Sequence, residues 1–328
     1  MTVGASRGMV VMDRETSAYV AVLATITVWS TAAAAVKLLM SDLPSYLVMF
    51  YVALFAVAGN LALVVLTGRT QRFLSYGRDD LSVFALMGLL GSYGYCMLYY
   101  NALDIAPVVV VSLVQYLWPI MTVLWTAILL KERPGRRAVT GLAMSLAGVM
   151  VIATGGDLSA LSLERFTGPL MAAAAAVCYG LFSAIGKRRD DDKVCAMAWS
   201  FIFYLSFTVP TVLVLVPEGF LLPGSSTLLG LAWMGVACYA IGYSLWLYAL
   251  SNGDTASMSN MTFLTPFLSL VWIRLLLNEP IPPSAVTGLI VIIAGILVTR
   301  SSRVTIPDVP SSRMPSPVPA AAMARDGD

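Results

Sequence analysis

The chain has 328 residues, of which 59% are hydrophobic and only 12% are charged, and its mean hydropathy is +0.83. Soluble globular chains carry about 25% charged residues, so this composition excludes a soluble protein and indicates an integral membrane protein. With a net charge of +2, we expect the lipid bilayer, and not a nucleic acid, to be its macromolecular environment.

Apolar runs long enough to cross a bilayer as helices recur along the chain between short polar breaks. Lipid offers no hydrogen-bond partner to backbone N–H and C=O groups, so these runs should be α-helices. We predict ten spans: Tyr19–Leu39, Pro44–Leu66, Leu81–Leu103, Pro107–Leu130, Ala138–Thr154, Thr167–Ile185, Val194–Leu215, Thr227–Leu250, Thr255–Leu277 and Ala285–Thr299. The last apolar run is short, and we expect its helix to begin a turn earlier, near Ser284.

Two tails flank these spans. Residues 1–18 are expected to be an N-terminal tail, and the first apolar run is too long for a cleavable signal peptide. Residues 300–328 are rich in Pro, Ser and Ala and are predicted to be a disordered tail. The 4 cysteines show no CxxC spacing, so we expect no metal site, no disulfide framework and no cofactor.

Lysine and arginine define the orientation, because basic loops remain in the cytoplasm. In the ten-span topology, all of the 20 basic residues lie on one side except Lys37, Arg165 and Arg274. Both termini are therefore predicted to be cytoplasmic.

A five-residue word shows an internal duplication. The sequence AVTGL at 138–142 returns at 285–289, and at the same offset of 147 Glu132 matches Glu279 and Pro119 matches Pro266. Residues 19–154 and 167–299 are thus predicted to be two units of five spans. An odd number of spans inverts the second unit, and the basic loop KERPGRR accordingly becomes NEPIPPS in the copy. Inverted repeats are typical of secondary transporters, which bind substrate between the halves.

Spans four and nine carry a polar stripe at helical spacing, which should face the bundle interior or a wet cavity. Interhelical hydrogen bonding is the alternative explanation. The prolines at 119 and 266 are interpreted as hinges or, equally, as static kinks. The stripe consists of Ser112, Gln115, Trp118, Thr122 and Trp125 in span four and of Ser259, Thr262, Thr265, Ser269 and Trp272 in span nine.

Spans three and eight hold most of the aromatic density. Some of these rings fit the headgroup belt, but Tyr95, Tyr99, Tyr239 and Tyr243 lie deeper in their spans. An aromatic pocket would stack planar or cationic ligands. Further rings that could complete its lining are Trp29, Tyr116, Tyr179, Trp199 and Trp246.

The sequence lacks the residues that several kinds of transport and catalytic chemistry require. The chain has no histidine, and no Asp or Glu lies at the centre of a predicted span. We therefore expect facilitated diffusion, or a coupling route that does not use a buried carboxylate. Glu132 and Glu279 lie past span ends, where a cap or gate contact is the expected role. The absence of a P-loop and of any hydrolytic motif argues against an enzyme and against an ATPase subunit. A passive channel is the alternative to a carrier.

The chain resembles the EamA-domain branch of the drug/metabolite transporter superfamily through a short pattern present in both halves: Ala102, Leu103, Pro119, Glu132, Gly141 and Gly148, copied as Ala249, Leu250, Pro266, Glu279, Gly288 and Gly295. We expect the glycines of this pattern to allow close helix packing. The resemblance implies a ten-helix basket around a central cavity in a bacterial inner membrane.

Within this family the chain looks like the YddG-type exporters of aromatic amino acids. That likeness implies Phe, Tyr and Trp as cargo, with Thr, Met and planar cations such as methyl viologen as further ones. An exporter of cationic drugs or of another metabolite is the alternative. The cavity residues implied are Tyr95, Tyr99, Gln115, Trp118, Tyr179, Tyr243, Trp246, Thr262 and Thr265, with Tyr116 and Trp199 as additional candidates.

Overall fold

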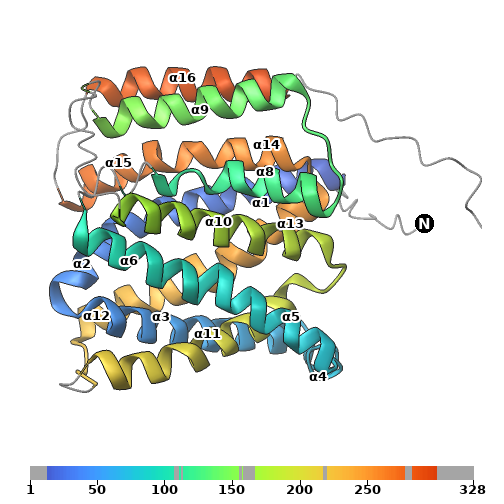
Figure 1. Cartoon of the computed structure of the whole chain (residues 1–328). Coiled ribbons are helices and arrows are strands. Elements are labelled where there is room, and N and C mark those ends of the chain that lie inside the picture. The colour runs from blue at the N-terminus through green and yellow to red at the C-terminus, as the bar shows by residue number, and fades with distance from the viewer. Residues whose placement is uncertain are drawn as a thin grey trace, which may run out of the picture.

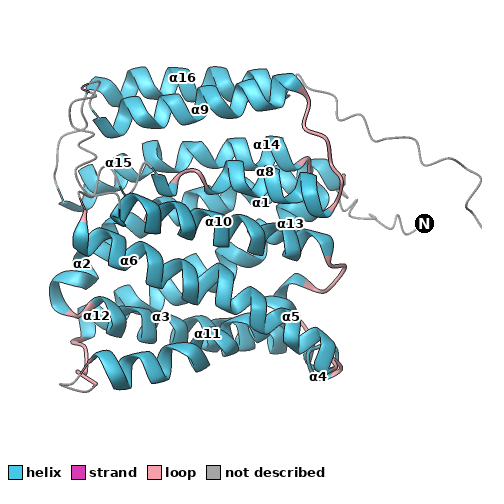
Figure 2. Ribbon diagram, viewed as in Figure 1, coloured by secondary structure: helices cyan, strands magenta, loops and turns pink. Residues whose placement is uncertain are grey.

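The structure is a computed structural model that describes residues 13–106, 111, 114–154, 157, 167–216, 220–277 and 283–300. Throughout these residues the regular structure is helical (Figure 2). The predicted tail at 300–328 lies outside them except for Arg300, as do Ser112, Arg165 and Glu279.

The described helices are taken in two consecutive groups, those up to Thr154 and those from Thr167. The first group is α1 (Arg14–Ser30), α2 (Ala32–Asp42), α3 (Ser45–Leu66), α4 (Thr70–Leu74), α5 (Arg78–Gly88), the π-helix η1 (Leu89–Gly94), α6 (Tyr95–Ile105), α8 (Trp118–Leu129) and α9 (Arg136–Thr154). The second is α10 (Thr167–Arg188), α11 (Lys193–Leu215), α12 (Ser225–Ala232), the π-helix η3 (Trp233–Ile241), α13 (Gly242–Asn252), α14 (Thr255–Met261), the 3-10 turn η4 (Thr262–Leu264), α15 (Thr265–Leu277) and α16 (Pro283–Arg300).

By length and composition, 7 helical stretches of the described chain can cross a membrane: Arg14–Asp42, Ser45–Leu66, Arg78–Ile105, Thr167–Arg188, Lys193–Leu215, Ser225–Asn252 and Thr255–Leu276. Shorter apolar helices cover Trp118–Leu129 and Pro283–Thr299. The protein is therefore a multi-pass, all-helical membrane protein. The predicted fourth span falls partly outside the described residues, and α9 and α16 coincide with the fifth and tenth.

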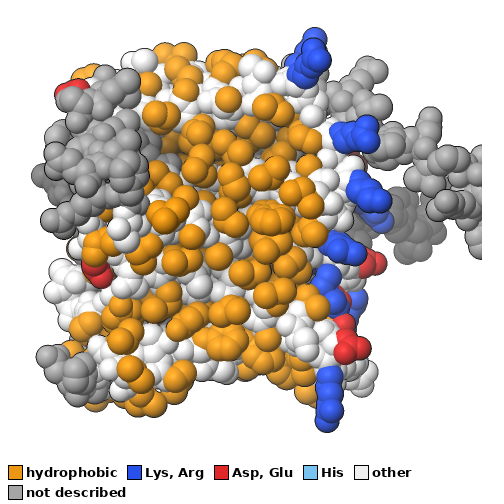
Figure 3. Space-filling model, viewed as in Figure 1, with side chains coloured by type: hydrophobic (Ala, Val, Ile, Leu, Met, Phe, Trp, Pro, Cys, Tyr) orange, Lys and Arg blue, Asp and Glu red, His pale blue; other side chains and the backbone are white. Residues whose placement is uncertain are grey.

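The outer surface agrees with a membrane environment. Hydrophobic side chains cover the middle of the visible face, and Lys and Arg gather along one edge (Figure 3). This edge is where Arg78 begins α5, Arg136 begins α9 and Lys193 begins α11. The helices thus present their basic ends to one side of the apolar band.

The predicted boundaries are accurate at α16, which begins at Pro283, next to the expected Ser284. The first helix begins earlier than the predicted Tyr19. Asp13 caps it by accepting a 2.6 Å hydrogen bond from the Thr16 backbone N–H, so the polar residues Arg14–Ser17 are helical although they precede the apolar run.

The structure corrects the expectation that each span is one continuous α-helix. Spans four and nine are interrupted at the same place: a turn at residues 116–117 precedes α8, and η4 precedes α15. Pro119 and Pro266 consequently lie in the first turn of α8 and α15, where a missing N–H costs no helical hydrogen bond. Spans three and eight change to π-helix at η1 and η3.

Helices α9 and α16 lie side by side at one edge of the molecule (Figure 1). Their contact runs through the predicted glycines: a Cβ on Gly141 would lie 2.5 Å from the carbonyl oxygen of Gly295, and one on Gly148 would lie 2.7 Å from that of Gly288. The reciprocal distances, from Gly288 to Gly148 and from Gly295 to Gly141, are both 2.6 Å. Only glycine allows the two backbones to approach this closely.

Candidate substrate site

Trp29 of α1 lies among aromatic rings from three other helices. Its ring centroid is 5.9 Å from Trp118 of α8, 6.1 Å from Tyr179 of α10, and 5.7 and 6.1 Å from Tyr243 and Trp246 of α13. We call these five residues the aromatic cluster. Two of them come from the first group of helices and three from the second, so the cluster joins the two groups.

The rings of the aromatic cluster also contact one another. Trp118 lies 4.9 Å from Tyr179 and 5.3 Å from Trp246, and Tyr179 lies 5.6 Å from Tyr243, all edge to face. This is a favourable geometry for aromatic pairs. Trp118, Tyr179, Tyr243 and Trp246 are all buried, so the rings themselves fill the space between these helices.

The aromatic cluster continues into α6. Tyr95 lies 5.3 Å from Tyr179 and stacks on Tyr99 at 5.9 Å. The Gln115 side-chain amide donates a 2.7 Å hydrogen bond to the Tyr95 hydroxyl. These contacts bring together most of the predicted lining of spans three, four, six and eight.

The two π-helices hold rings of the aromatic cluster in place. Trp29 Nε1 donates to the carbonyl oxygen of Cys238 in η3 at 2.8 Å, and the Tyr243 hydroxyl donates to that of Gly91 in η1 at 3.1 Å. Gly91 and Cys238 are equivalent at the 147-residue offset. Each group of helices therefore offers the same carbonyl to a ring of the other group. Such local departures from the α-helix frequently occur at functional sites.

Trp199 and Tyr116 lie elsewhere. Trp199 stacks on Phe73 at 4.7 Å and donates to its carbonyl oxygen at 3.0 Å, which fastens α4 to α11. Tyr116 packs against the hydrophobic cluster that contains Val123 and Phe263, beside α9. Sequence spacing could not separate these rings from the others, because all of them fall within predicted apolar spans.

The side chains of the polar stripe form hydrogen bonds largely with the backbone of their own helix. The hydroxyls of Thr122 and Ser269 donate to carbonyls one turn earlier, at 2.9 Å each, and Thr262 donates to Ser259 at 2.6 Å. The Thr265 hydroxyl is buried without a hydrogen-bond partner. Trp272 Nε1 reaches Ser30 of α1 at 2.9 Å. Interhelical bonding therefore accounts for part of the stripe.

A charged network lies at the basic end of the molecule, where three segments meet. Glu132, in the loop after α8, forms a 2.7 Å ion pair with Lys187 in the last turn of α10. The Thr255 hydroxyl, at the start of α14, donates to Glu132 at 2.7 Å and accepts from Lys187 at 2.5 Å. Sequence reasoning assigned Glu132 to a cap or gate, but it could not identify the partners.

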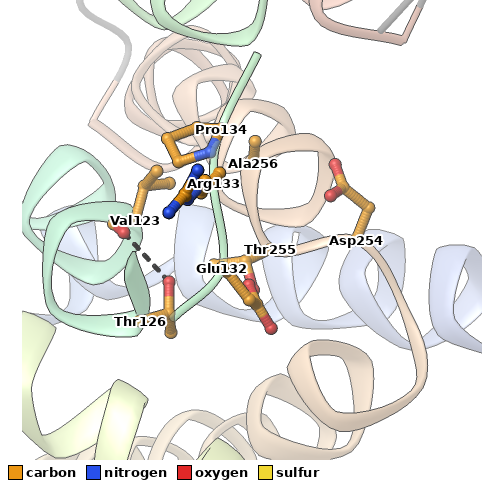
Figure 4. A pocket seen from close by; sticks show the side chains of 8 residues that line it. All are labelled: Val123, Thr126, Glu132, Arg133, Pro134, Asp254, Thr255 and Ala256. Atoms are coloured by element: carbon orange, nitrogen blue, oxygen red, sulfur yellow. Dashed lines mark hydrogen bonds between the residues drawn. The ribbon is translucent and has the colours of Figure 1, made fainter. Parts of the chain in front are cut away.

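A small pocket borders this network (Figure 4). Its lining comprises Val123, Thr126, Glu132, Arg133, Pro134, Asp254, Thr255 and Ala256, and its volume is about 20 Å³. A cavity needs about 10–15 Å³ to hold one water molecule, so this pocket has room for at least one water. Within the described residues no group of three metal-ligating His, Cys, Asp or Glu side chains occurs.

Known proteins resemble the chain over most of its length. An uncharacterized transporter of Archaeoglobus fulgidus is 24% identical over 286 residues, or 85% of this chain and 96% of that protein. The aromatic amino acid exporter YddG of Ancylobacter novellus is 30% identical over 192 residues, or 56% of this chain and 63% of YddG. One solved crystal structure superimposes with a TM-score of 0.74 at 25% identity and covers 87% of this chain and 96% of its own.

The sequence profile of the EamA-like transporter family matches twice, at residues 16–154 and again at residues 166–301. These two matches cover both groups of helices. The chain therefore belongs to the EamA-like transporter family.

Proposed function

We propose that this transporter exports amino acids, aromatic ones foremost, from the cytoplasm across a bacterial inner membrane. The observation that carries the proposal is the aromatic cluster, in which four rings from three other helices surround Trp29. Aromatic side chains of a substrate would replace ring-to-ring contacts of the same kind. The likeness to an aromatic amino acid exporter supports this choice of cargo.

The proposed mechanism is alternating access between two inverted repeats of five helices, at 19–154 and 167–299, in a ten-span topology. The matched interruptions before α8 and α15, and the matched π-helices η1 and η3, support it. Discontinuous helices at corresponding positions of two halves are typical of such transporters near their substrate site. The basic edge would face the cytoplasm, together with both termini.

We expect transport to be facilitated diffusion. The rings of the aromatic cluster are neutral, and the described ion pairs lie at the basic end, among them Glu132–Lys187 and Arg69–Asp192. A proton-coupled carrier usually places a titratable relay within the membrane. The aromatic cluster offers aromatic faces and hydroxyls in place of such a relay.

Radiolabelled phenylalanine flux in proteoliposomes tests this function. We expect saturable flux and counterflow of the same magnitude with and without a pH gradient. Strict dependence on the proton gradient would contradict facilitated diffusion. Unsaturable flux accompanied by single-channel currents would instead indicate a passive channel.

Planar cations are a second candidate cargo, favoured by the ring faces of the aromatic cluster. A cation over an aromatic ring gains about 0.5–2 kcal/mol, most when desolvated. Competition of methyl viologen with phenylalanine flux would support shared binding.

A further inference from the structure

The Glu132–Lys187–Thr255 network links the two groups of helices at the basic end. Glu132 belongs to the first group, whereas Lys187 and Thr255 belong to the second. The three side chains form a closed triangle, since each contacts the other two at 2.5–2.7 Å. The Lys187 side chain is only 11% exposed and that of Glu132 is 30% exposed. Opening a path between the groups at this end requires the ion pair to separate.

Separating the ion pair without replacement would be unfavourable. Each charge would be left partly buried and without its partner, which is strongly destabilising. A compound that supplies one charge compensates only one of the two residues. A compound that supplies both charges, a short distance apart, compensates both and keeps the net charge of the site constant.

We propose that the Glu132–Lys187 pair binds the head group of zwitterionic α-amino acids at the cytoplasmic end. The substrate carboxylate would pair with Lys187 and the substrate ammonium with Glu132, and the exchange would break the link between the helix groups. This inference rests on the proposed amino-acid export. It adds a head-group site, separate from the aromatic cluster, that distinguishes zwitterions from simple amines and acids.

The surroundings of the pair fit this role. Glu132 and Thr255 line the small pocket at the basic end, so two members of the network border an existing recess (Figure 4). Asp254, another wall residue, is already engaged as the N-cap of α14, where it accepts a 2.8 Å hydrogen bond from the Ser257 backbone N–H. That leaves the Glu132 carboxylate as the acceptor positioned beside a lysine for exchange with a substrate.

Binding of three matched compounds tests the inference: phenylalanine, phenethylamine, which lacks the carboxylate, and 3-phenylpropionate, which lacks the ammonium. Equilibrium dialysis with the full-length protein in detergent measures affinity without requiring transport. We expect phenylalanine to bind about tenfold or more tightly than either analogue, because hydrogen bonds to charged groups are the strong ones. Equal affinity of all three compounds would overturn the proposal.

Single substitutions should shift this preference in opposite directions. Glu132→Gln retains the lysine and should favour 3-phenylpropionate, whereas Lys187→Gln retains the carboxylate and should favour phenethylamine. If the ion pair only holds the gate closed, each substitution should change the affinities for all three compounds by the same factor. That result would also overturn the proposal. If the variants fail to fold, the wild-type comparison of the three compounds still decides.

The ion pair between Arg69 and Asp192 provides a matched control, because it joins the same two groups of helices at 2.8 Å. The variant with Arg69→Gln and Asp192→Asn should retain the wild-type preference for phenylalanine; an equal loss of preference there would count against the proposal. Absence of saturable phenylalanine flux in wild-type proteoliposomes would contradict amino-acid export, whereas the binding preferences decide on the head-group site.

Discussion

Trp29 contacts all four other rings of the aromatic cluster, yet a single tryptophan in the first span carries no motif. Its indole N–H is fixed on Cys238 and its ring faces touch four neighbours. Gly242 is constrained by the same ring, since a Cβ there would lie 2.6 Å from Trp29 Nε1. The position of this one side chain therefore sets the spacing of α1 and α13.

Replacing Trp29 with alanine should weaken phenylalanine binding and flux. An aromatic pair contributes about 0.5–1.5 kcal/mol beyond the area it buries, so losing the contact between Trp29 and the substrate ring should raise the half-saturation concentration of counterflow by about two- to tenfold. Trp199→Ala is the matched control, because that ring lies on Phe73 and not in the aromatic cluster. Similar effects of both substitutions on half-saturation would argue that the cluster does not bind the substrate.

At the scale of the elements, the backbones of α9 and α16 approach each other at four glycines, and the side chains of Ile152 and Ile292 pack against two of these glycines. Ser145 adds a hydrogen bond of 3.3 Å to the carbonyl oxygen of Ile292 in the middle of this contact. Asn260 of α14 donates to the carbonyl oxygen of Gly295 at 2.9 Å and thereby attaches α16 to the interrupted span nine. The pair thus forms a support at one edge of the molecule.

Gly148→Val should destabilise this support. The new Cβ would lie 2.7 Å from the Gly288 carbonyl oxygen, and overpacking typically costs about 1–3 kcal/mol. We expect a lower midpoint of thermal unfolding in detergent. Gly135→Val is the control, since a Cβ at that glycine meets no atom within 4 Å. An unchanged midpoint for Gly148→Val would show that the helices separate without cost.

At the scale of the whole molecule, the basic edge and the apolar band predict how the protein sits in the membrane. The loop after α4 lies at the basic edge and the start of α12 at the opposite edge (Figure 1). Ser75 and Ser225 are exposed at these two places. With the native cysteines replaced by alanine, Ser225→Cys should react with an impermeant maleimide in intact cells, and Ser75→Cys should react only after permeabilisation. The reverse pattern would contradict cytoplasmic termini.

The hydropathy, the internal repeat and the distribution of charge already indicated from the sequence that the protein is a helical membrane transporter. Each of these features depends only on residues that are neighbours in the chain or copies of one another. The length of an apolar run determines that it can span a bilayer, and the AVTGL repeat marks the duplication without any contact being known. The glycines were expected to allow close packing for the same reason: they occur at equivalent places in both copies.

Only the tertiary structure decided which side chains meet. Tyr116, Trp118 and Trp199 look alike in the sequence as aromatic residues of predicted apolar spans, but the packing of the folded chain brings Trp118 alone of these to Trp29. The partners of Glu132 lie far along the chain, in α10 and α14. Contacts of this kind depend on how whole helices pack, and the pattern within one helix carries no information about the rotation of its neighbour.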